Sequence, residues 1–221
     1  MRPISHIRPL RPIRPILLLI ICLASLATLH AETNGRKILD NAVSRIKKMG
    51  ELKADFTATT FTGTTEQGST SGTMLLKGRK FKLTTPEMTT WYDGEKQWCY
   101  VPETEEVNLS IPTQKEMQAV NPYSFMSLYK KGYNISVRES SLRGQLVYEV
   151  HLIAKNVNYG AQEIYVDISC KDYALMCIRV RQDKDWHRIS IHSCTGEQHF
   201  QESDFTFPKE LYPDAELIDL R

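Results

Sequence analysis

The sequence predicts a mainly β protein with α-helices (an α+β fold), in which an antiparallel sheet of about ten or eleven strands curves around an apolar interior. Three observations lead to this prediction. Short alternating segments follow one another from Gly72 to Ile111, and again from Tyr133 to His192. Turn residues separate these segments at close intervals. Helical periodicity is confined to a segment before the first strand and to another between the two groups.

The first group of strands shows the clearest alternation. Phe81 and Leu83 point to one face, while Lys80 and Lys82 point to the other. A strand of this kind buries one face and exposes the other to water, which is typical of an antiparallel sheet. Asp93-Gly94 lies between two aromatic-rich segments and predicts a hairpin with a type I′ turn.

The remaining strands are predicted from the same alternation. The second group covers Tyr133–Ser140, Leu146–Ala154, Glu163–Ser169, Met176–Gln182 and Trp186–His192. A Thr-rich strand over Leu52–Phe61 precedes the first group. We expect Gly63–Ser71 to form a loop and Ser203–Pro208 to form a short closing strand, with a polar tail after it.

Two segments have helical character. Residues 34–49 place apolar side chains at helical spacing and end at Gly50, which predicts an amphipathic helix. The second segment, Gln114–Lys131, predicts one or two short helices that restart at Asn121-Pro122, since proline suits a first helical turn. This second segment either packs as ordinary core or forms a lid over a cavity.

The N-terminal residues predict export. Arginines without any acidic residue precede an apolar run from Ile16 to Ala27, which is typical of a signal peptide. We therefore expect residues 1–31 to be a cleaved signal peptide and residues 32–221 to form one domain, with cleavage after Ala31 or after Ala27. The signal peptide contains four arginines, so its removal changes the net charge from +2 to −2. No basic patch points to nucleic acid.

Four cysteines remain in the predicted mature chain: Cys99, Cys170, Cys177 and Cys194. In an oxidising compartment they allow three disulfide connectivities, and the sequence does not choose among them. Cys170 and Cys177 flank a predicted turn between adjacent strands, which makes them the favoured pair.

The patterns that carry catalysis are missing from the sequence. It contains no Gly-rich phosphate loop, no zinc-protease pair and no nucleophile with an obvious base. The cluster of His187, His192, Cys194 and His199 suggests a metal site, but its spacing follows strand alternation and matches no standard zinc motif. We expect neither an enzyme nor a cofactor.

The order of these features resembles the outer-membrane lipoprotein carrier protein (LolA) family of Gram-negative periplasms. The resemblance rests on the opening helix, Leu52–Phe56, Gly72, Lys80–Leu83, Pro86, Asp93-Gly94 followed by Trp98, Tyr100 and Pro102, Val107, the Asn121-Pro122 helix and Asp204–Phe207. Each motif alone is weak, and their order along the chain is the specific feature.

The resemblance implies an incomplete, strongly curved antiparallel β-barrel, with helices forming a lid over an apolar cavity. In the family this cavity holds the acyl chains of a lipoprotein. The implied function is that of a periplasmic chaperone that carries lipoproteins from the inner to the outer membrane. Its implied partners are acylated lipoproteins, an inner-membrane lipoprotein-release transporter and an outer-membrane acceptor, and we expect a monomer.

The predicted lipid-binding residues are Phe81, Leu83, Trp91, Trp98, Tyr100, Phe125, Met126 and Leu128. Family members often carry Arg-Pro at the start of the third strand, where the arginine ties the lid. This sequence has no proline there, and Arg79 is the residue expected to take that role. Two alternatives stay open, because fold alone does not decide cargo: a carrier of another lipid, and an envelope-stress sensor.

Overall fold

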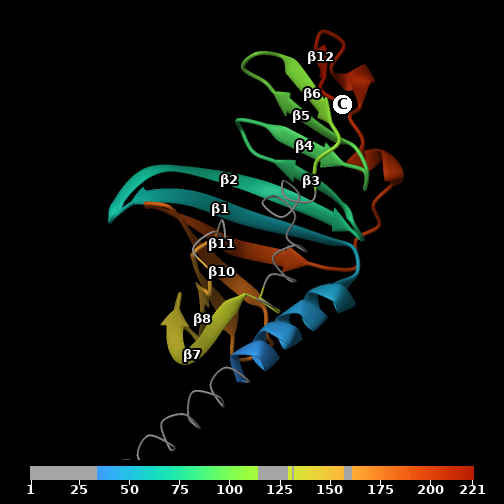
Figure 1. The fold of residues 1–221 in the computed structure, drawn as a ribbon. Helices are drawn as coiled ribbons and strands as arrows, with labels where there is room; N and C mark the ends of the chain where they lie inside the picture. Colours follow the sequence, from blue (N-terminus) through green and yellow to red (C-terminus); the bar gives the residue numbers. More distant parts are fainter. Residues whose placement is uncertain (1–33, 114–128, 131, 157–160) are drawn as a thin grey trace, which may run out of the picture.

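The computed structural model describes residues 34–113, 129–130, 132–156 and 161–221. Its main feature is one sheet with the strand order β12-β6-β5-β4-β3-β2-β1-β11-β10-β9-β8-β7. The strands are β1 (Leu52–Thr62), β2 (Thr65–Lys77), β3 (Lys80–Thr84), β4 (Thr89–Tyr92), β5 (Gln97–Val101), β6 (Glu106–Ser110), β7 (Tyr133–Leu142), β8 (Gln145–Ala154), β9 (Glu163–Ser169), β10 (Leu175–Gln182), β11 (Asp185–Thr195) and β12 (Glu216–Asp219). The sheet is open and strongly curved (Figure 1), which confirms the predicted fold class with twelve strands.

All neighbouring strands run antiparallel except β12 and β6, which run parallel. Directly paired residues share a face, so the register sorts the side chains of the sheet into two sets. We call concave the face that carries Leu76, Phe81 and Leu152, and convex the opposite face. The register carries each face across several strands, as in the line formed by Ile135, Leu152 and Ile164 on β7, β8 and β9.

A helix over residues 34–49 lies on the concave face. Its first half contributes Ile38, Leu39 and Ala42 to a core with the apolar side chains of β7–β9. Its second half places Ile46 and Met49 against a smaller cluster. That cluster consists of Leu52, Leu76, Phe81 and Tyr92. The predicted amphipathic helix is confirmed over the described residues, and it crosses the sheet from β7–β9 towards β1–β4.

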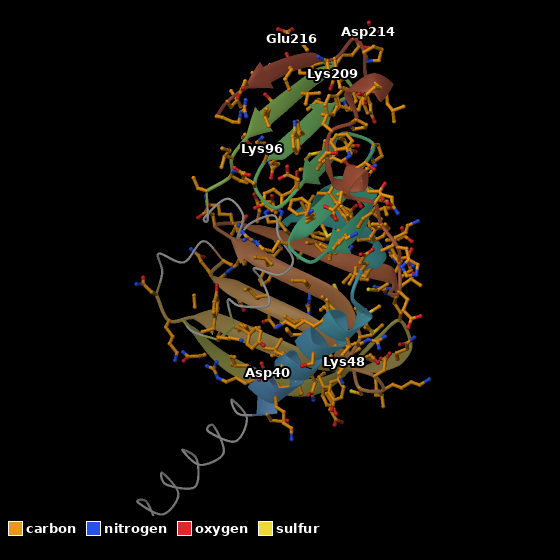
Figure 2. The ribbon with its side chains drawn as sticks, turned by 90° about the vertical axis from the view of Figure 1, so that its right-hand side faces the viewer. Asp40, Lys48, Lys96, Lys209, Asp214 and Glu216 are labelled. Carbon is orange, nitrogen blue, oxygen red and sulfur yellow. The ribbon has the colours of Figure 1, made fainter. Side chains whose placement is uncertain are left out.

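The C-terminal segment covers the convex face of β3–β6 at the other end of the molecule. Figure 2 shows this separation, with Asp40 and Lys48 of the helix at one end and Lys209 and Glu216 at the other. Trp91 is 1% exposed, and its ring packs edge-on at 5.6 Å from Phe207. Further contacts join Trp91 and Tyr100 to Tyr212, with ring centroids at 6.0 and 4.5 Å. We call Trp91, Tyr100, Phe207 and Tyr212 the convex aromatic cluster.

Residues 63–71, expected to form a loop, belong mostly to a strand, because β2 begins at Thr65. This half of β2 pairs with the Thr-rich part of β1, where Ser71 Oγ lies 3.0 Å from Thr57 Oγ1. Glycine and serine have low strand propensity, but cross-strand pairing overrides it here.

The end of the chain also differs from the prediction. The segment expected to form a closing strand, Ser203–Pro208, instead overlaps a 3₁₀ helix, η1 (Glu202–Phe205). A second 3₁₀ helix, η2 (Lys209–Leu211), follows in the expected polar tail. The Asp204 carboxylate accepts a hydrogen bond from the Gln201 backbone N–H at 2.8 Å, which favours a helical turn at this point. The closing strand is β12, in the segment that was expected to be a polar tail.

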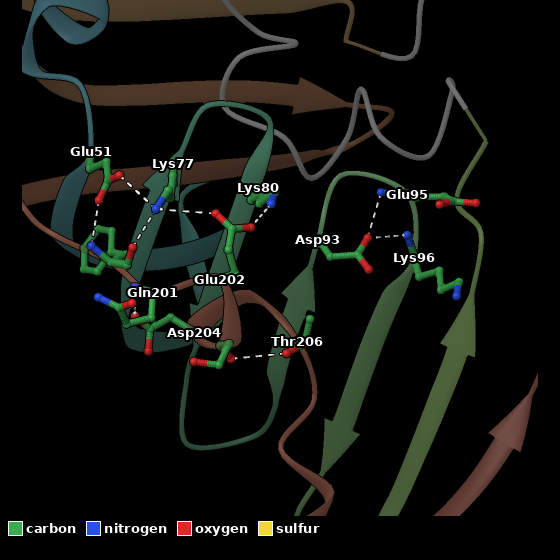
Figure 3. A network of polar contacts seen from close by, with 12 residues as sticks. Glu51, Lys77, Lys80, Asp93, Glu95, Lys96, Gln201, Glu202, Asp204 and Thr206 are labelled. Atoms are coloured by element: carbon green, nitrogen blue, oxygen red, sulfur yellow. Dashed lines mark hydrogen bonds and ion pairs between the residues drawn. The ribbon is translucent and has the colours of Figure 1, made fainter.

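The hairpin predicted at Asp93-Gly94 is confirmed, but its turn is not type I′. The turn spans residues 93–96, between β4 and β5. The Asp93 Oδ1 atom accepts the backbone N–H groups of Glu95 and Lys96, each at 2.8 Å (Figure 3). In this turn only Gly94 adopts positive φ, at 105°. The aspartate side chain therefore organises a longer turn than the dipeptide alone predicts.

Candidate functional site: the concave face

Apolar side chains line the concave face between the two buried clusters. The register places Phe56 opposite Ile191, Ala58 opposite Ile189, and Met74 opposite Leu83. These residues come from four neighbouring strands, β11, β1, β2 and β3. All of them are half-buried except Ile189, which is 37% exposed within the described part of the chain.

A tight backbone contact fixes Phe56 on this face. An added Cβ atom at Gly72 would lie 2.7 Å from the Phe56 Cζ atom and 2.6 Å from the Thr84 carbonyl oxygen. Gly72 thus leaves the space that the Phe56 ring occupies beside β2. The result is a half-buried aromatic ring in a defined place, next to the aliphatic side chains of β11.

The predicted lipid-binding residues divide between the two faces. Phe81 and Leu83 lie on the concave face, where Phe81 is fully buried in the core and Leu83 is half-buried at its margin. Trp91, Trp98 and Tyr100 lie on the convex face, because Trp91 pairs with Trp98, and Tyr100 pairs with Val107. Two of the eight predicted residues therefore lie on the apolar concave face.

The other three predicted residues, Phe125, Met126 and Leu128, lie outside the described residues. The same is true of residues 114–128 of the predicted lid. The structure does describe the start of the chain after it. The Arg36 guanidinium donates to the carbonyl oxygens of Tyr129 and Lys130 at 3.0 and 3.1 Å. The Tyr129 hydroxyl donates to Asp40 at 2.6 Å.

These contacts attach the chain that follows residue 128 to the N-terminal half of the helix. Burial raises the pKa of Tyr129, and the neighbouring Asp40 carboxylate raises it further. The phenol therefore keeps its proton and donates to the carboxylate over the physiological range. No periodic pattern in the sequence indicates this contact, because Arg36 and Asp40 lie on the polar side of an amphipathic helix.

Arg79 lies exposed in the turn between β2 and β3. Its role in tying the lid stays a prediction, because residues 114–128 are not described. Its neighbours have a different role, visible in Figure 3. Lys77 donates to the Phe200 carbonyl at 2.6 Å and pairs with Glu51 at 3.1 Å, and Lys80 pairs with Glu202. The lysines of this turn thus hold the C-terminal segment against the sheet.

The cysteine prediction was wrong for its favoured pair. All four cysteines in the described residues are free. The register pairs Cys177 with Asp167, and residues 170–174 turn away between the strands, so Cys170 does not face Cys177.

The suggested metal cluster has ordinary hydrogen-bond partners. His187 and His192 contact the hydroxyls of Thr60 and Thr57, at 3.2 and 2.8 Å. Within the part of the chain that the structure describes, no three His, Cys, Asp or Glu side chains are grouped to hold a metal ion. The same part contains no helix that is both long and apolar enough to cross a membrane.

A curved, open, mostly antiparallel sheet with a helix across its apolar concave face is a LolA-like fold. The sequence matches the family described as "Outer membrane lipoprotein carrier protein LolA" over residues 24–184, and the chain belongs to that family. No curated protein matches the sequence significantly.

Several solved structures are similar to this one at low sequence identity. An uncharacterized conserved protein from Thermus thermophilus is 11% identical, with a TM-score of 0.57, over 84% of this chain and 99% of the other. LppX, a lipoprotein from Mycobacterium tuberculosis, is 11% identical with a TM-score of 0.49, over 76% and 98% of the two chains. A putative outer membrane lipoprotein-sorting protein domain from Vibrio parahaemolyticus is 11% identical with a TM-score of 0.46, over 82% and 99%. At this identity the Thermus protein shows a common fold alone.

The residues missing from the sequence-based site are Phe56, Ile189 and Ile191. A signal for them was present, since Ile189 and Ile191 alternate with polar residues along β11. The alternation did not show which face of the sheet is left partly exposed by the described residues, and this choice requires the position of the helix and of the C-terminal segment.

Proposed function

We propose that the protein binds acyl chains on its concave face and carries lipoproteins through the periplasm, from the inner to the outer membrane. The observation that supports this most is the group of partly exposed apolar side chains formed by Phe56, Leu83, Ile189 and Ile191. Neighbouring apolar side chains that are not fully buried support a binding site for an apolar ligand or partner. Membership of a family described as a lipoprotein carrier supports the same assignment.

The chemistry of the face fits a hydrocarbon ligand. Burial of an acyl chain is worth about 0.8 kcal/mol for each CH₂ group and needs no hydrogen-bond partner. An open sheet leaves room for such chains, whereas a closed barrel of about eight strands is nearly filled by its own side chains. Partial burial of a chain gives useful affinity and still permits transfer to an acceptor.

The remaining parts of the proposal follow from the carrier role. The protein takes acylated lipoproteins from an inner-membrane release transporter and passes them to an outer-membrane acceptor. It acts as a monomer in the periplasm after cleavage of its signal peptide, and it performs no catalysis. The phenol, lysines and carboxylates described above serve to hold segments of the chain together.

Release of a lipoprotein from spheroplasts tests this function. Leu83→Asp places a charge at the margin of the concave face and is expected to abolish release, because a buried carboxylate opposes burial of an acyl chain. Thr84→Asp is the matched control, since Thr84 is the next residue of β3 and lies exposed on the convex face. Circular dichroism checks that both variants fold. Normal release by folded Leu83→Asp protein would contradict the proposal.

A further inference from the structure

The convex face of β9–β11 and β1 carries three arginines that each lie over an aromatic ring. The Arg179 guanidinium lies 4.6 Å from the centroid of the Tyr165 ring, and the Arg188 guanidinium lies 4.8 Å from that of Phe61. A longer contact of 5.9 Å joins Arg181 to Trp186. We call these six residues the arginine–aromatic face: Phe61, Tyr165, Arg179, Arg181, Trp186 and Arg188.

Strand register assembles this face. Tyr165 lies directly opposite Arg179 across β9 and β10, and Arg181 lies opposite Trp186 across β10 and β11. The Tyr165 and Trp186 rings lie 5.8 Å apart and join the first two pairs. Stacking on a ring immobilises a guanidinium while its N–H edges stay available to an acceptor. The face is therefore organised before any partner arrives.

Carboxylates neutralise the arginines on one side of the face only. Glu149 pairs with Arg179 at 2.7 Å, and Glu163 pairs with Arg181 at 3.3 Å. Arg188 has no carboxylate partner in the described residues, and the register places it directly opposite Arg179. Like charges directly opposite one another are unfavourable in a sheet. The positive charge of this face is thus uncompensated at Arg188.

The hydrogen bonding of the arginines agrees with this. The Nε atoms of Arg179, Arg181 and Arg188 are buried and lack a hydrogen-bond partner in the described part of the protein. Unpaired buried donors are uncommon in folded proteins. Each of the three stacked guanidinium groups thus keeps one N–H donor that no group in the described residues accepts.

We propose that the arginine–aromatic face is a docking surface for an acidic segment of a protein partner, in which a partner carboxylate pairs with Arg188. Tyrosine, tryptophan and arginine are the residues that dominate the energetics of protein interfaces. A protein segment fits better than a membrane surface, because Glu149 and Glu163 already pair with Arg179 and Arg181, which leaves one arginine for a single carboxylate. Anionic membranes are instead bound by clusters of about four to eight basic residues. The face lies on the opposite side of the sheet from the cargo site, so the inference goes beyond the proposed carrier function.

Fluorescence anisotropy with labelled peptides tests the inference. The probe is a twelve-residue peptide with four glutamates among Ser, Gly and Tyr, and its control replaces the four glutamates with glutamine. We expect the acidic peptide to bind more tightly than the control, with an affinity that falls as salt rises. Arg188→Glu is expected to weaken binding of the acidic peptide about tenfold or more. Lys209→Glu makes the same charge change on an exposed residue of η2 and is expected to leave binding unchanged.

Further variants keep the test decisive. If Arg188→Glu fails to fold, Arg188→Gln replaces it and is expected to weaken binding in the same direction, while Arg188→Lys retains part of the affinity. Equal weakening by Lys209→Glu would show a response to net charge and overturn the inference. Binding to vesicles with a third of anionic phospholipid, lost in the Arg188 variant, would assign the face to membranes and overturn it as well.

Discussion

The two halves of the sheet are covered by different elements, which lie on opposite faces. Strands β7–β10 are covered on the concave face by the helix, and their convex face carries paired charges such as Glu149 and Arg179. Strands β3–β6 are shorter, and their convex face is covered by the C-terminal segment around Trp91 and Phe207. The halves thus differ in the element that covers them, and β3 and β4 are also buried on the concave face, where Phe81 and Tyr92 pack near the end of the helix.

This difference shows why alternation within strands does not by itself locate a binding site. Trp91 and Phe81 are both aromatic residues in predicted half-buried strands, yet they lie on opposite faces and in different cores. Between the halves, on β1, β2, β3 and β11, the concave face is covered only in part by the described residues. The candidate cargo site therefore lies at the junction.

A substitution in the convex aromatic cluster is expected to have the largest effect on the free energy of unfolding. Trp91→Ala is expected to lower the free energy of unfolding by about 3–5 kcal/mol, because it removes a fully buried indole from a packed core. Trp98→Ala is the control, since Trp98 is the cross-strand neighbour of Trp91 on the same face but is only half-buried. Urea denaturation measures both variants. Equal losses in the two would contradict a core centred on Trp91.

The junction between the halves is tested by Gly72→Ala. The new methyl group would meet the Phe56 ring and the Thr84 carbonyl oxygen, so we expect a loss of about 1–3 kcal/mol from overpacking. Gly68→Ala is the matched control on the same strand, because nothing lies within 4 Å of its added Cβ atom. If Gly72→Ala is as stable as Gly68→Ala, the close packing at the junction is wrong.

A substitution on the charged convex face of β7–β11 is expected to lower the free energy of unfolding by a smaller amount. Burial alone would raise the pKa of Glu149, but hydrogen bonds from Arg138 and Arg179 outweigh it and hold the pKa below its usual value. The ionised group therefore stabilises the fold above its unfolded pKa, and this contribution is lost as the pH falls through the lower folded pKa.

Glu149→Gln removes this charge. We expect it to lower the free energy of unfolding at pH 7 by about 1–2 kcal/mol, with a discount because Arg138 is largely exposed. It should also flatten the loss of stability that occurs as the pH falls from about 4.5 through the lower folded pKa of Glu149. Thermal unfolding at a series of pH values measures both effects. An unchanged acid limb in the variant would show that Glu149 does not stabilise the fold by its charge.

The pKa of neighbouring Asp167 is shifted in the opposite direction, upwards. Burial raises its pKa, and Arg179 offsets this only in part. Its ionisation therefore costs stability as the pH rises above the unfolded value, so its titration partly cancels that of Glu149 in the wild-type protein.

A substitution that loosens the attachment of the C-terminal segment is expected to have the smallest effect on stability. The backbone N–H of Phe200 donates to Glu51 at 2.6 Å, and this bond, helped by Lys77, lowers the pKa of Glu51. Glu51→Gln should leave the unfolding midpoint unchanged and reduce the hydrogen-exchange protection of the Phe200 amide. Wild-type protein should lose the same protection below pH 4.5, as Glu51 titrates through its lowered pKa. Glu95→Gln is the control. Unaltered protection in Glu51→Gln would show that Glu51 does not hold the Phe200 amide.

Much of the fold was predictable because it depends on local patterns. Alternation at Lys80–Leu83 and periodicity at Ile38 and Leu39 each identify an element by the face that it buries. The errors have non-local causes. Strand β2 extends through glycine and serine because β1 pairs with it, and β12 forms because β6 offers an edge.

The candidate site was less predictable than the fold for the same reason. Phe81 and Trp91 carry similar local signals, and only the covering elements separate a concave core residue from a convex one. Ile189 was missed because alternation along β11 does not show which face of the sheet the covering elements occupy, although its exposure makes it a direct probe of the concave face.

Native mass spectrometry of the mature protein, purified gently from its own periplasm, tests the central claim most directly. We expect wild-type protein to carry an acylated lipoprotein. Ile189→Asp should carry none, while Ser190→Asp, the next residue of β11 on the convex face, should retain it. Loss of the ligand from the Ile189 variant alone would place the acyl chains on the concave face. A ligand retained by folded Ile189→Asp protein, or one displaced equally by Ser190→Asp, would contradict the account.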